Sequence, residues 1–259
     1  MEFHSPNKNF LLAALPAADL EHLRPRLELC LLTVGQVVSE CGETPEYAYF
    51  PTTCIVSMVS MLENGNSAEI SVVGNEGVVG ISLFMGGENT SCRVVVQASG
   101  YAYKLHSKYL KTEFAQHGAL MQLMLRYTQA VITQVTQTAV CYRHHTIDQQ
   151  YCRWLLLSLD RQQTHHIKMT QIQIANMLGV RRESVTEAAL KLQKLGVIEY
   201  SRGNITVLNR AKLEQLSCEC YAVVKKETAR LFPVKTPDYM YANLAQAARQ
   251  KNAFSAVAR

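Results

Sequence analysis

The sequence lacks the features of a membrane or secreted protein. No apolar run approaches the roughly 20 residues that a transmembrane helix needs. The first twenty residues also lack the positively charged start and the long apolar stretch of a secretory signal. We therefore expect a cytoplasmic protein with no membrane partner.

Motifs of enzymes are missing as well. The chain has no Gly-rich phosphate loop, no nucleophile elbow, no zinc-protease helix and no paired carboxylates in a recognisable context. Serine, histidine and aspartate are present, but no local pattern joins them. The sequence thus predicts a protein that is not an enzyme and has no catalytic residues.

The eight cysteines form no CxxC pair. Cys218 and Cys220 make an isolated CxC on an expected helix, where side chains two positions apart diverge. The adjacent His144 and His145 also point in different directions on a helix. Without a secretory signal, we expect reduced, separately buried thiols and no metal site. No residue pattern in the sequence identifies a cofactor, so the sequence leaves any cofactor unknown.

Positive charge is concentrated in one part of the chain. The 259 residues are enough for two domains, and the net charge is +5. Residues 146–212 hold ten lysines and arginines against five acidic residues, whereas the rest of the chain is balanced. Such a concentration is typical of a domain that binds a polyanion.

Residues 170–195 have the pattern of a helix-turn-helix. Thr170 and Gln173 have the spacing of a capping box, and Gly179 suits the turn between the two helices. The second helix opens with Arg181-Arg182-Glu183-Ser184, which are side chains suited to the major groove. An αα-hairpin with solvated charges would share this spacing, so a second signal is needed.

That second signal is a predicted wing. Val197–Tyr200 and Ile205–Leu208 are short β-type runs, separated by Ser201–Asn204, whose composition favours a hairpin turn. Arg202 stands at the tip, where it could contact a phosphate. A plain surface hairpin is the alternative. Together the two signals predict a winged helix-turn-helix at 144–210.

The N-terminal part has a different texture. From about residue 33 to residue 105, short β-rich runs alternate with glycine and proline, and Glu63–Asn66 is a strong hairpin turn. This pattern predicts a β-roll or jelly roll within a domain at 7–106. The expected fold class is α+β.

Residues 107–143 have a helical pattern with two neighbouring apolar rows, which predicts a dimerisation helix and hinge. One row can cover the β-roll, and the other invites a second copy of the chain. Packing within a monomer would explain only one row. A C-terminal extension at 211–259 is expected to contain a helix at about 211–231 and a peripheral tail. The residues predicted for the dimer helix are Leu120, Met124, Tyr127, Val131, Gln134 and Thr138.

This layout resembles the cyclic-AMP receptor protein / FNR superfamily of bacterial transcription regulators over roughly residues 7–208. The resemblance is most specific at Leu178–Thr186, where the family has a Gly, two residues and then Arg-Glu-Ser/Thr-Val. The roll resembles the family through Gly35, Tyr49-Phe50, Gly74, Gly80 and Leu83-Phe84.

The resemblance implies roles for the recognition helix. Arg182 would read guanine and Glu183 would accept from a cytosine amino group, with Thr186 and Glu187 completing the base-reading set. Glu187 stands where the family often has a second arginine, so the half-site should differ from the best-known one. The implied phosphate-binding residues are Thr170, Gln171, Arg181, Ser184 and Arg202.

The effector cassette departs from the family. Cyclic-nucleotide binders carry Gly-Glu-x-x-Leu followed by an Arg-Ser/Thr pair, whereas this chain has Ile81 at the glutamate position and lacks the pair. Standard cyclic-AMP binding is therefore not expected. The N-terminal cysteine set of iron–sulfur members is absent too. The candidate effector-pocket residues are Gly80, Ile81, Ser82, Arg93, Tyr127 and Thr128.

The sequence thus predicts a dimeric, sequence-specific transcription regulator that reads a palindromic operator in the major groove, under control of an unidentified effector in the roll. Its expected partners are double-stranded DNA and a second copy of itself, with RNA polymerase as a further candidate. The alternative is a small-molecule-sensing module whose winged domain mediates protein–protein contacts.

Overall fold

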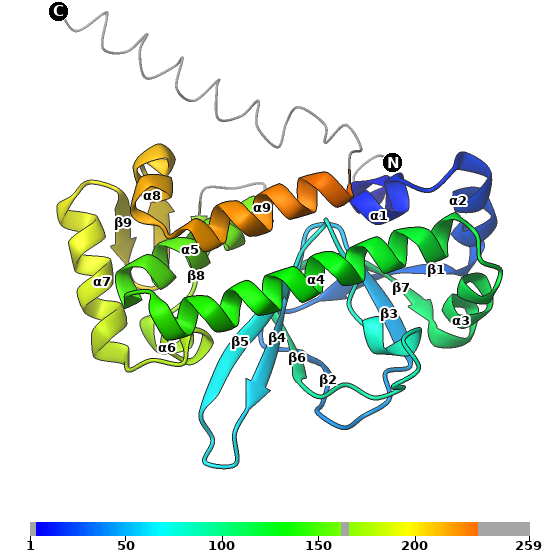
Figure 1. The fold of residues 1–259 in the computed structure, drawn as a ribbon, viewed down its shortest axis with the longest axis horizontal. Helices are drawn as coiled ribbons and strands as arrows, with labels where there is room; N and C mark the ends of the chain where they lie inside the picture. The colour runs from blue at the N-terminus through cyan, green and yellow to red at the C-terminus, as the bar shows by residue number, and fades with distance from the viewer. Residues whose placement is uncertain (1–3, 162–165, 233–259) are drawn as a thin grey trace, which may run out of the picture.

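The structure is a computed structural model that describes residues 4–161 and 166–232. An N-terminal β-roll and a C-terminal helical domain lie side by side, with two long helices running across both (Figure 1). This arrangement confirms the predicted α+β class, with a roll, a long helix and a winged helix-turn-helix. None of the described helices is both long and apolar enough to cross a membrane.

The roll consists of two antiparallel sheets. One has the strand order β1-β7-β3 and the other β2-β6-β4-β5. The predicted turn joins β4 to β5, and Gly65 there has a φ of +84°, which glycine adopts at no steric cost. The strands are β1 (Leu27–Leu32), β2 (Val37–Ser39), β3 (Tyr47–Pro51), β4 (Ile55–Met61), β5 (Ser67–Val73), β6 (Arg93–Ala98) and β7 (Gly100–His106).

Short helices pack against the roll, and residues of α1, α2 and η4 belong to its core. Asn9 caps α1 by accepting from the backbone amides of Leu11 and Leu12, and its own side-chain amide donates to the Gly77 and Pro51 carbonyls. The capped helix is thereby fixed onto the roll. These segments are η2 (Pro6–Lys8), α1 (Phe10–Ala13), α2 (Ala17–Leu23), η3 (Arg24–Arg26) and η4 (Ile81–Leu83).

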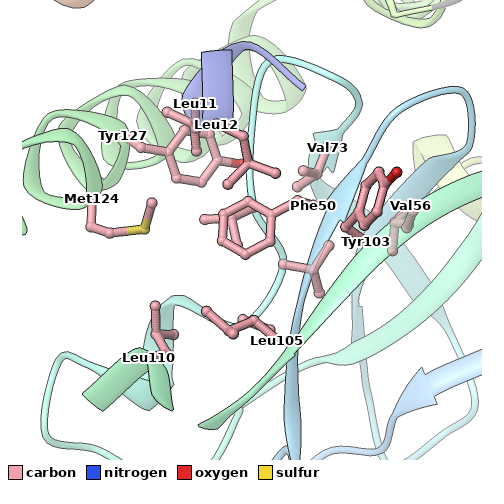
Figure 2. Packing of buried hydrophobic residues seen from close by; sticks show 14 of the residues in the cluster. Leu11, Leu12, Phe50, Val56, Val73, Tyr103, Leu105, Leu110, Met124 and Tyr127 are labelled. Carbon is pink, nitrogen blue, oxygen red and sulfur yellow. The ribbon is translucent and has the colours of Figure 1, made fainter. Parts of the chain in front are cut away.

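The predicted helical stretch at 107–143 is two helices. α3 (Ser107–Ala115) ends before His117, which has a φ of +57°, and α4 (Ala119–His144) begins after Gly118. Met124 and Tyr127 of α4 lie against the core of the roll, which includes Phe50 (Figure 2). α4 therefore covers the core of the roll and also connects the roll to the second domain.

The apolar row of α4 that was predicted to form the dimer contact is instead the row that covers the roll. The row assigned to the dimer helix, from Leu120 to Thr138, is buried within the chain itself. The exposed row contains Leu125, Ile132 and Val140, whose relative exposures are 50%, 51% and 43%. The first row faces the protein's own roll, where Leu120, Met124, Tyr127 and Val131 join the hydrophobic core.

The C-terminal domain follows the helix-turn-helix pattern. The predicted capping box is present at Thr170–Gln173, and a second capping box, which was not predicted, is present at Thr146–Gln149. A three-stranded sheet with the order β8-β10-β9 completes the wing, and its first strand was not predicted. The elements are α5 (Ile147–Asp160), β8 (His166–Lys168), α6 (Gln171–Leu178), α7 (Arg182–Lys194), β9 (Ile198–Ser201) and β10 (Asn204–Val207).

The chain then adds two helices where one was predicted. α8 (Arg210–Leu216) and α9 (Glu219–Leu231) are separated at Ser217 and Cys218. α9 returns along α4 (Figure 1), and the two helices are in direct contact. Phe232 reaches the core of the roll. The predicted tail beyond residue 232 lies outside the described residues.

The two domains are packed against each other. α6 lies on β5, where the Ser67 hydroxyl donates to the Asn176 carbonyl over 3.3 Å. Ile55 and Val72 of the roll belong to the hydrophobic cluster of the winged domain. The position of the recognition helix is therefore set by the roll as well as by the hinge.

Candidate nucleic-acid interface

The N-terminal turn of α7 presents the predicted base-reading residues to solvent. Arg182, Glu183 and Glu187 are exposed, and Thr186 is half-buried. The opposite face of the helix packs into the domain core through Val185, Ala188, Ala189 and Leu192. This division follows the helical period of the sequence, so the charged side chains have no place in the core.

The start of α7 also suits an anion. Gly179 turns the chain with a φ of +66°, and Arg181 occupies the N-cap position. Among the described residues, the Arg181 side chain makes no capping hydrogen bond to the first turn. Backbone amides at a helix N-terminus, together with the positive end of the helix dipole, attract phosphate. Arg181 is exposed beside them and Ser184 is half-buried.

A hydrogen bond between the two helices positions the reading surface. The Thr186 hydroxyl lies 2.7 Å from Oε1 of Gln171 at the start of α6 and 3.1 Å from the Arg182 carbonyl. With its side-chain oxygen engaged, Gln171 can still offer its amide protons to a phosphate. Thr170 likewise uses its hydroxyl for the capping box.

The wing lies next to the same surface. Arg202 is exposed at the β9–β10 turn with a φ of +49°, and the Met169 amide donates to the Gly203 carbonyl over 2.7 Å. A Cβ placed on Gly203 would lie 3.7 Å from the Thr170 side chain. The wing tip is therefore held against the N-terminus of α6, which brings Arg202 close to Thr170.

Tyr200 is a residue that the sequence reasoning missed. It lies half-buried in β9, and its hydroxyl is 3.4 Å from the Met169 carbonyl. Burial raises the pKa of Tyr200, whereas a backbone hydrogen bond from Gln171 and the charge of Arg182 lower it. Tyr200 thus lies between the wing and the recognition helix. Its position in an alternating strand was the available signal, but aromatic residues in strands are too common to stand out.

The structure divides the basic residues of this domain into two groups. Arg153 is buried and bonded to Thr138, Arg161 pairs with Glu76 at 2.6 Å, and Arg210 pairs with Asp160. These three arginines hold helices together and contribute little to the outer surface. The exposed basic residues near the reading helix and wing are Lys168, Arg181, Arg182, Lys191, Lys194 and Arg202, of which Lys191 pairs with Asp148.

The predicted effector residues do not meet at one place. Gly80, Ile81 and Ser82 line a cavity of about 40 Å³ inside the roll, large enough for a few water molecules. Arg93 instead pairs with Glu40 at 2.6 Å on the outer side. Thr128 is tied to the Met124 carbonyl of its own helix.

Tyr127 is also committed to packing. It is fully buried beside Gly77, where a Cβ would collide with its ring. Burial strongly raises the pKa of Tyr127. The structure therefore supports only the 80–82 segment as a pocket wall among the six predicted residues.

The comparisons with known proteins agree with this geometry. Residues 149–216 match the family model of the Crp-like helix-turn-helix domain. No curated protein sequence matches the chain. The fold is similar to that of solved Crp/Fnr regulators, and at the identities found this likeness concerns the fold.

Three such structures are representative. A transcriptional regulator assigned to the Crp/Fnr family from Eubacterium rectale has a TM-score of 0.62 at 17% identity, over 81% of this chain and 98% of that chain. FixK2 from Bradyrhizobium japonicum has a TM-score of 0.63 at 16% identity, over 74% and 98%. A CRP-family regulator from Thermus thermophilus has a TM-score of 0.60 at 17% identity, over 73% and 96%.

Proposed function

We propose, from the premise that the chain carries a Crp-like helix-turn-helix domain on the fold of the Crp/Fnr regulators, that it is a dimeric, sequence-specific transcription regulator. The observation that carries this proposal is the exposed Arg182-Glu183 pair on the first turn of α7. An arginine there can donate two parallel hydrogen bonds to guanine, and a glutamate can accept from cytosine.

The surroundings of that pair support DNA over another partner. Positive side chains gather at the helix start and the wing, while the inner arginines are used in the protein's own packing. Phosphate contacts from Arg181 and Arg202 would fix the register of α7 in the groove. Because they release counterions, binding should weaken steeply as salt rises.

The exposed row of α4 supports a dimer. Leu125, Ile132 and Val140 lie on the outer face of a 26-residue helix, apart from the row that covers the roll. Two such faces packed together would bury them and pair two recognition helices. RNA polymerase as a partner stays a prediction.

The effector is proposed to differ from cyclic AMP bound in the standard mode. Ile81 cannot accept a hydrogen bond from a ribose hydroxyl, and Arg93 is already paired with Glu40. The cavity beside Gly80 is also far smaller than a nucleotide pocket.

The first prediction tests DNA reading. Selection from a random DNA library should return a consensus for the wild type, and Arg182→Ala should lose about 1–3 kcal/mol of discrimination at one base pair. Glu183→Ala should relax the neighbouring position. Fluorescence anisotropy with the selected site and with scrambled DNA measures both effects.

The matched control is Arg24→Ala, which removes an exposed arginine far along the chain at the N-terminal helices. It should leave affinity and specificity unchanged. If Arg182→Ala and Glu183→Ala also behave like wild type, α7 does not read DNA. A chain that ignores DNA even at low salt would favour the alternative of a winged domain used for protein contacts.

A further inference from the structure

Four side chains from distant parts of the chain meet where α4 ends and α9 begins. Cys141 and His145 lie one turn apart at the end of α4, and Cys218 and Cys220 lie at the start of α9. The three sulfurs and one imidazole nitrogen are all within 4.8 Å of one another. The expectation of separately buried thiols is therefore wrong for these three cysteines.

The distances suit a single tetrahedral metal ion. Sγ of Cys141 and Sγ of Cys218 are 3.5 Å apart, and Sγ of Cys220 is 3.6 Å from Nδ1 of His145. With bonds of about 2.3 Å to sulfur and 2.0 Å to nitrogen, a tetrahedral ion holds two sulfurs about 3.8 Å apart and a sulfur–nitrogen pair about 3.5 Å apart. Both observed separations are close to these values, and the other pairs of the four atoms lie within 4.8 Å.

Two other uses of the cysteines fit less well. A disulfide needs sulfurs about 2.05 Å apart, well below the observed separation. An iron–sulfur cluster distributes its ligands over two or more iron atoms, which spreads the whole set of ligands further than one ion does. The compact set favours one ion.

The groups around the four ligands complete the pattern of a metal site. Nδ1 of His145 faces the sulfurs, while its Nε2 lies 3.2 Å from the Glu219 carboxylate. A carboxylate behind a metal-bound histidine fixes the ring and its tautomer. The Gln150 side-chain amide donates to the His145 carbonyl over 2.9 Å and holds the turn that carries this ring.

Burial and charge are also suitable. The three cysteines are almost fully buried, and the His145 side chain is only 14% exposed. Three thiolates around a divalent cation leave one negative charge, and the buried Arg153 lies close enough to act electrostatically on Cys141 and Cys220. A closed set of four ligands without room for substrate is typical of a structural site.

We propose that Cys141, His145, Cys218 and Cys220 bind one zinc-class divalent cation, which fastens α9 to the end of α4. Borderline-soft cations such as Zn²⁺ prefer this combination of thiolate and imidazole ligands. The ion would join the long helix, the hinge before α5 and the C-terminal helix at one point. This proposal concerns metal binding and does not rest on the proposed DNA function.

The test starts with the full chain, purified reduced and without chelator. Elemental analysis should find about one zinc per chain. Replacement by Co²⁺ should give the intense visible bands of tetrahedral cobalt with thiolate charge transfer, a readout that needs no variant. A chain that takes up no zinc, or a cobalt form with the weak spectrum of octahedral coordination, would overturn the proposal.

Variants then test the ligands individually. Cys220→Ser should lose most of the bound metal, whereas His145→Cys should retain it because a Cys₄ set is also tetrahedral. Glu219→Gln should weaken zinc affinity by about 10–100-fold through the imidazole. Cys41→Ala, an exposed thiol outside the cluster, is the matched control and should bind like wild type. Equal losses in Cys41→Ala and Cys220→Ser would contradict the assignment.

Discussion

Glu69 is an acidic side chain buried among polar groups. It lies fully buried in β5, where the Ser57 hydroxyl donates to its carboxylate over 2.6 Å. Burial raises its pKa to about 7, although the Ser57 bond and the charges of Arg161 and Arg153 lower it. The carboxyl group is therefore easier to keep protonated in the folded chain than in the unfolded one.

This raised pKa predicts a pH-dependent stability. The folded pKa lies above the unfolded value, so the stabilising contribution is complete below about pH 4.5 and is lost as pH rises through about 7. Glu69→Gln keeps a neutral group at all pH values. The variant should therefore lack the fall in the free energy of unfolding, up to about 3 kcal/mol, that Glu69 causes in wild type between pH 5 and pH 8.

Urea unfolding at several pH values measures this effect, with the exposed Glu63→Gln as the control. A variant as pH-dependent as wild type across that range would show that Glu69 is ionised in the folded protein.

Gly77 illustrates a packing limit at a single residue. A Cβ at this position would collide with the ring of the fully buried Tyr127, which has no room to move. Gly77→Ala should therefore lower the free energy of unfolding by about 1–3 kcal/mol. Thermal unfolding measures this, and Gly87→Ala, where nothing lies within 4 Å of the new methyl group, should be nearly neutral. Similar losses in both variants would point to a general effect of alanine.

At the scale of elements, α4 has two faces with different tasks. Its inner face covers the roll, and its outer face leaves Leu125 and Ile132 half-exposed. Replacing both with glutamate would place charges in the proposed dimer seam. We expect the double variant to be monomeric in analytical ultracentrifugation and to bind an operator at least tenfold more weakly than wild type.

A matched control for that change is Leu31→Glu, which alters an exposed leucine on β1. It should leave the association state unchanged. A double variant that still sediments as a dimer would place the dimer contact elsewhere.

The elements could be predicted where their signals are local. Capping boxes, hairpin turns and the helical period are all contained in short windows, so the winged domain and the β4–β5 turn were found correctly. The sequence did not show which apolar row of α4 faces inward, because that depends on which residues fit against the roll. The period alone gives two equivalent rows.

The site shows the same contrast between local and distant information. The recognition helix could be predicted because Arg182 and Glu183 are adjacent in sequence. The Cys141–Cys218 contact could not, since it needs α9 to return along α4 across 77 positions. The inner roles of Arg161 and Arg210 were missed for the same reason, because Glu76 and Asp160 are remote partners.

At the scale of the whole molecule, a two-fold dimer predicts the form of the operator. Two copies of α7 related by a two-fold axis between the paired α4 helices should read half-sites in opposite orientation, with centres about 34 Å apart. The selected consensus should be palindromic, and titration should give two chains per site. A consensus without symmetry, or one chain per site, would contradict the proposed assembly.

The packing of α6 on β5 has a thermodynamic consequence. Swinging the winged domain away from the roll would hydrate Ile55 and Val72, which now share its hydrophobic cluster. Hydrating apolar surface raises the heat capacity. The free-energy difference between the docked and the released orientation would therefore depend nonlinearly on temperature. A protein built in this way would respond to warming and cooling even at a fixed concentration of any ligand.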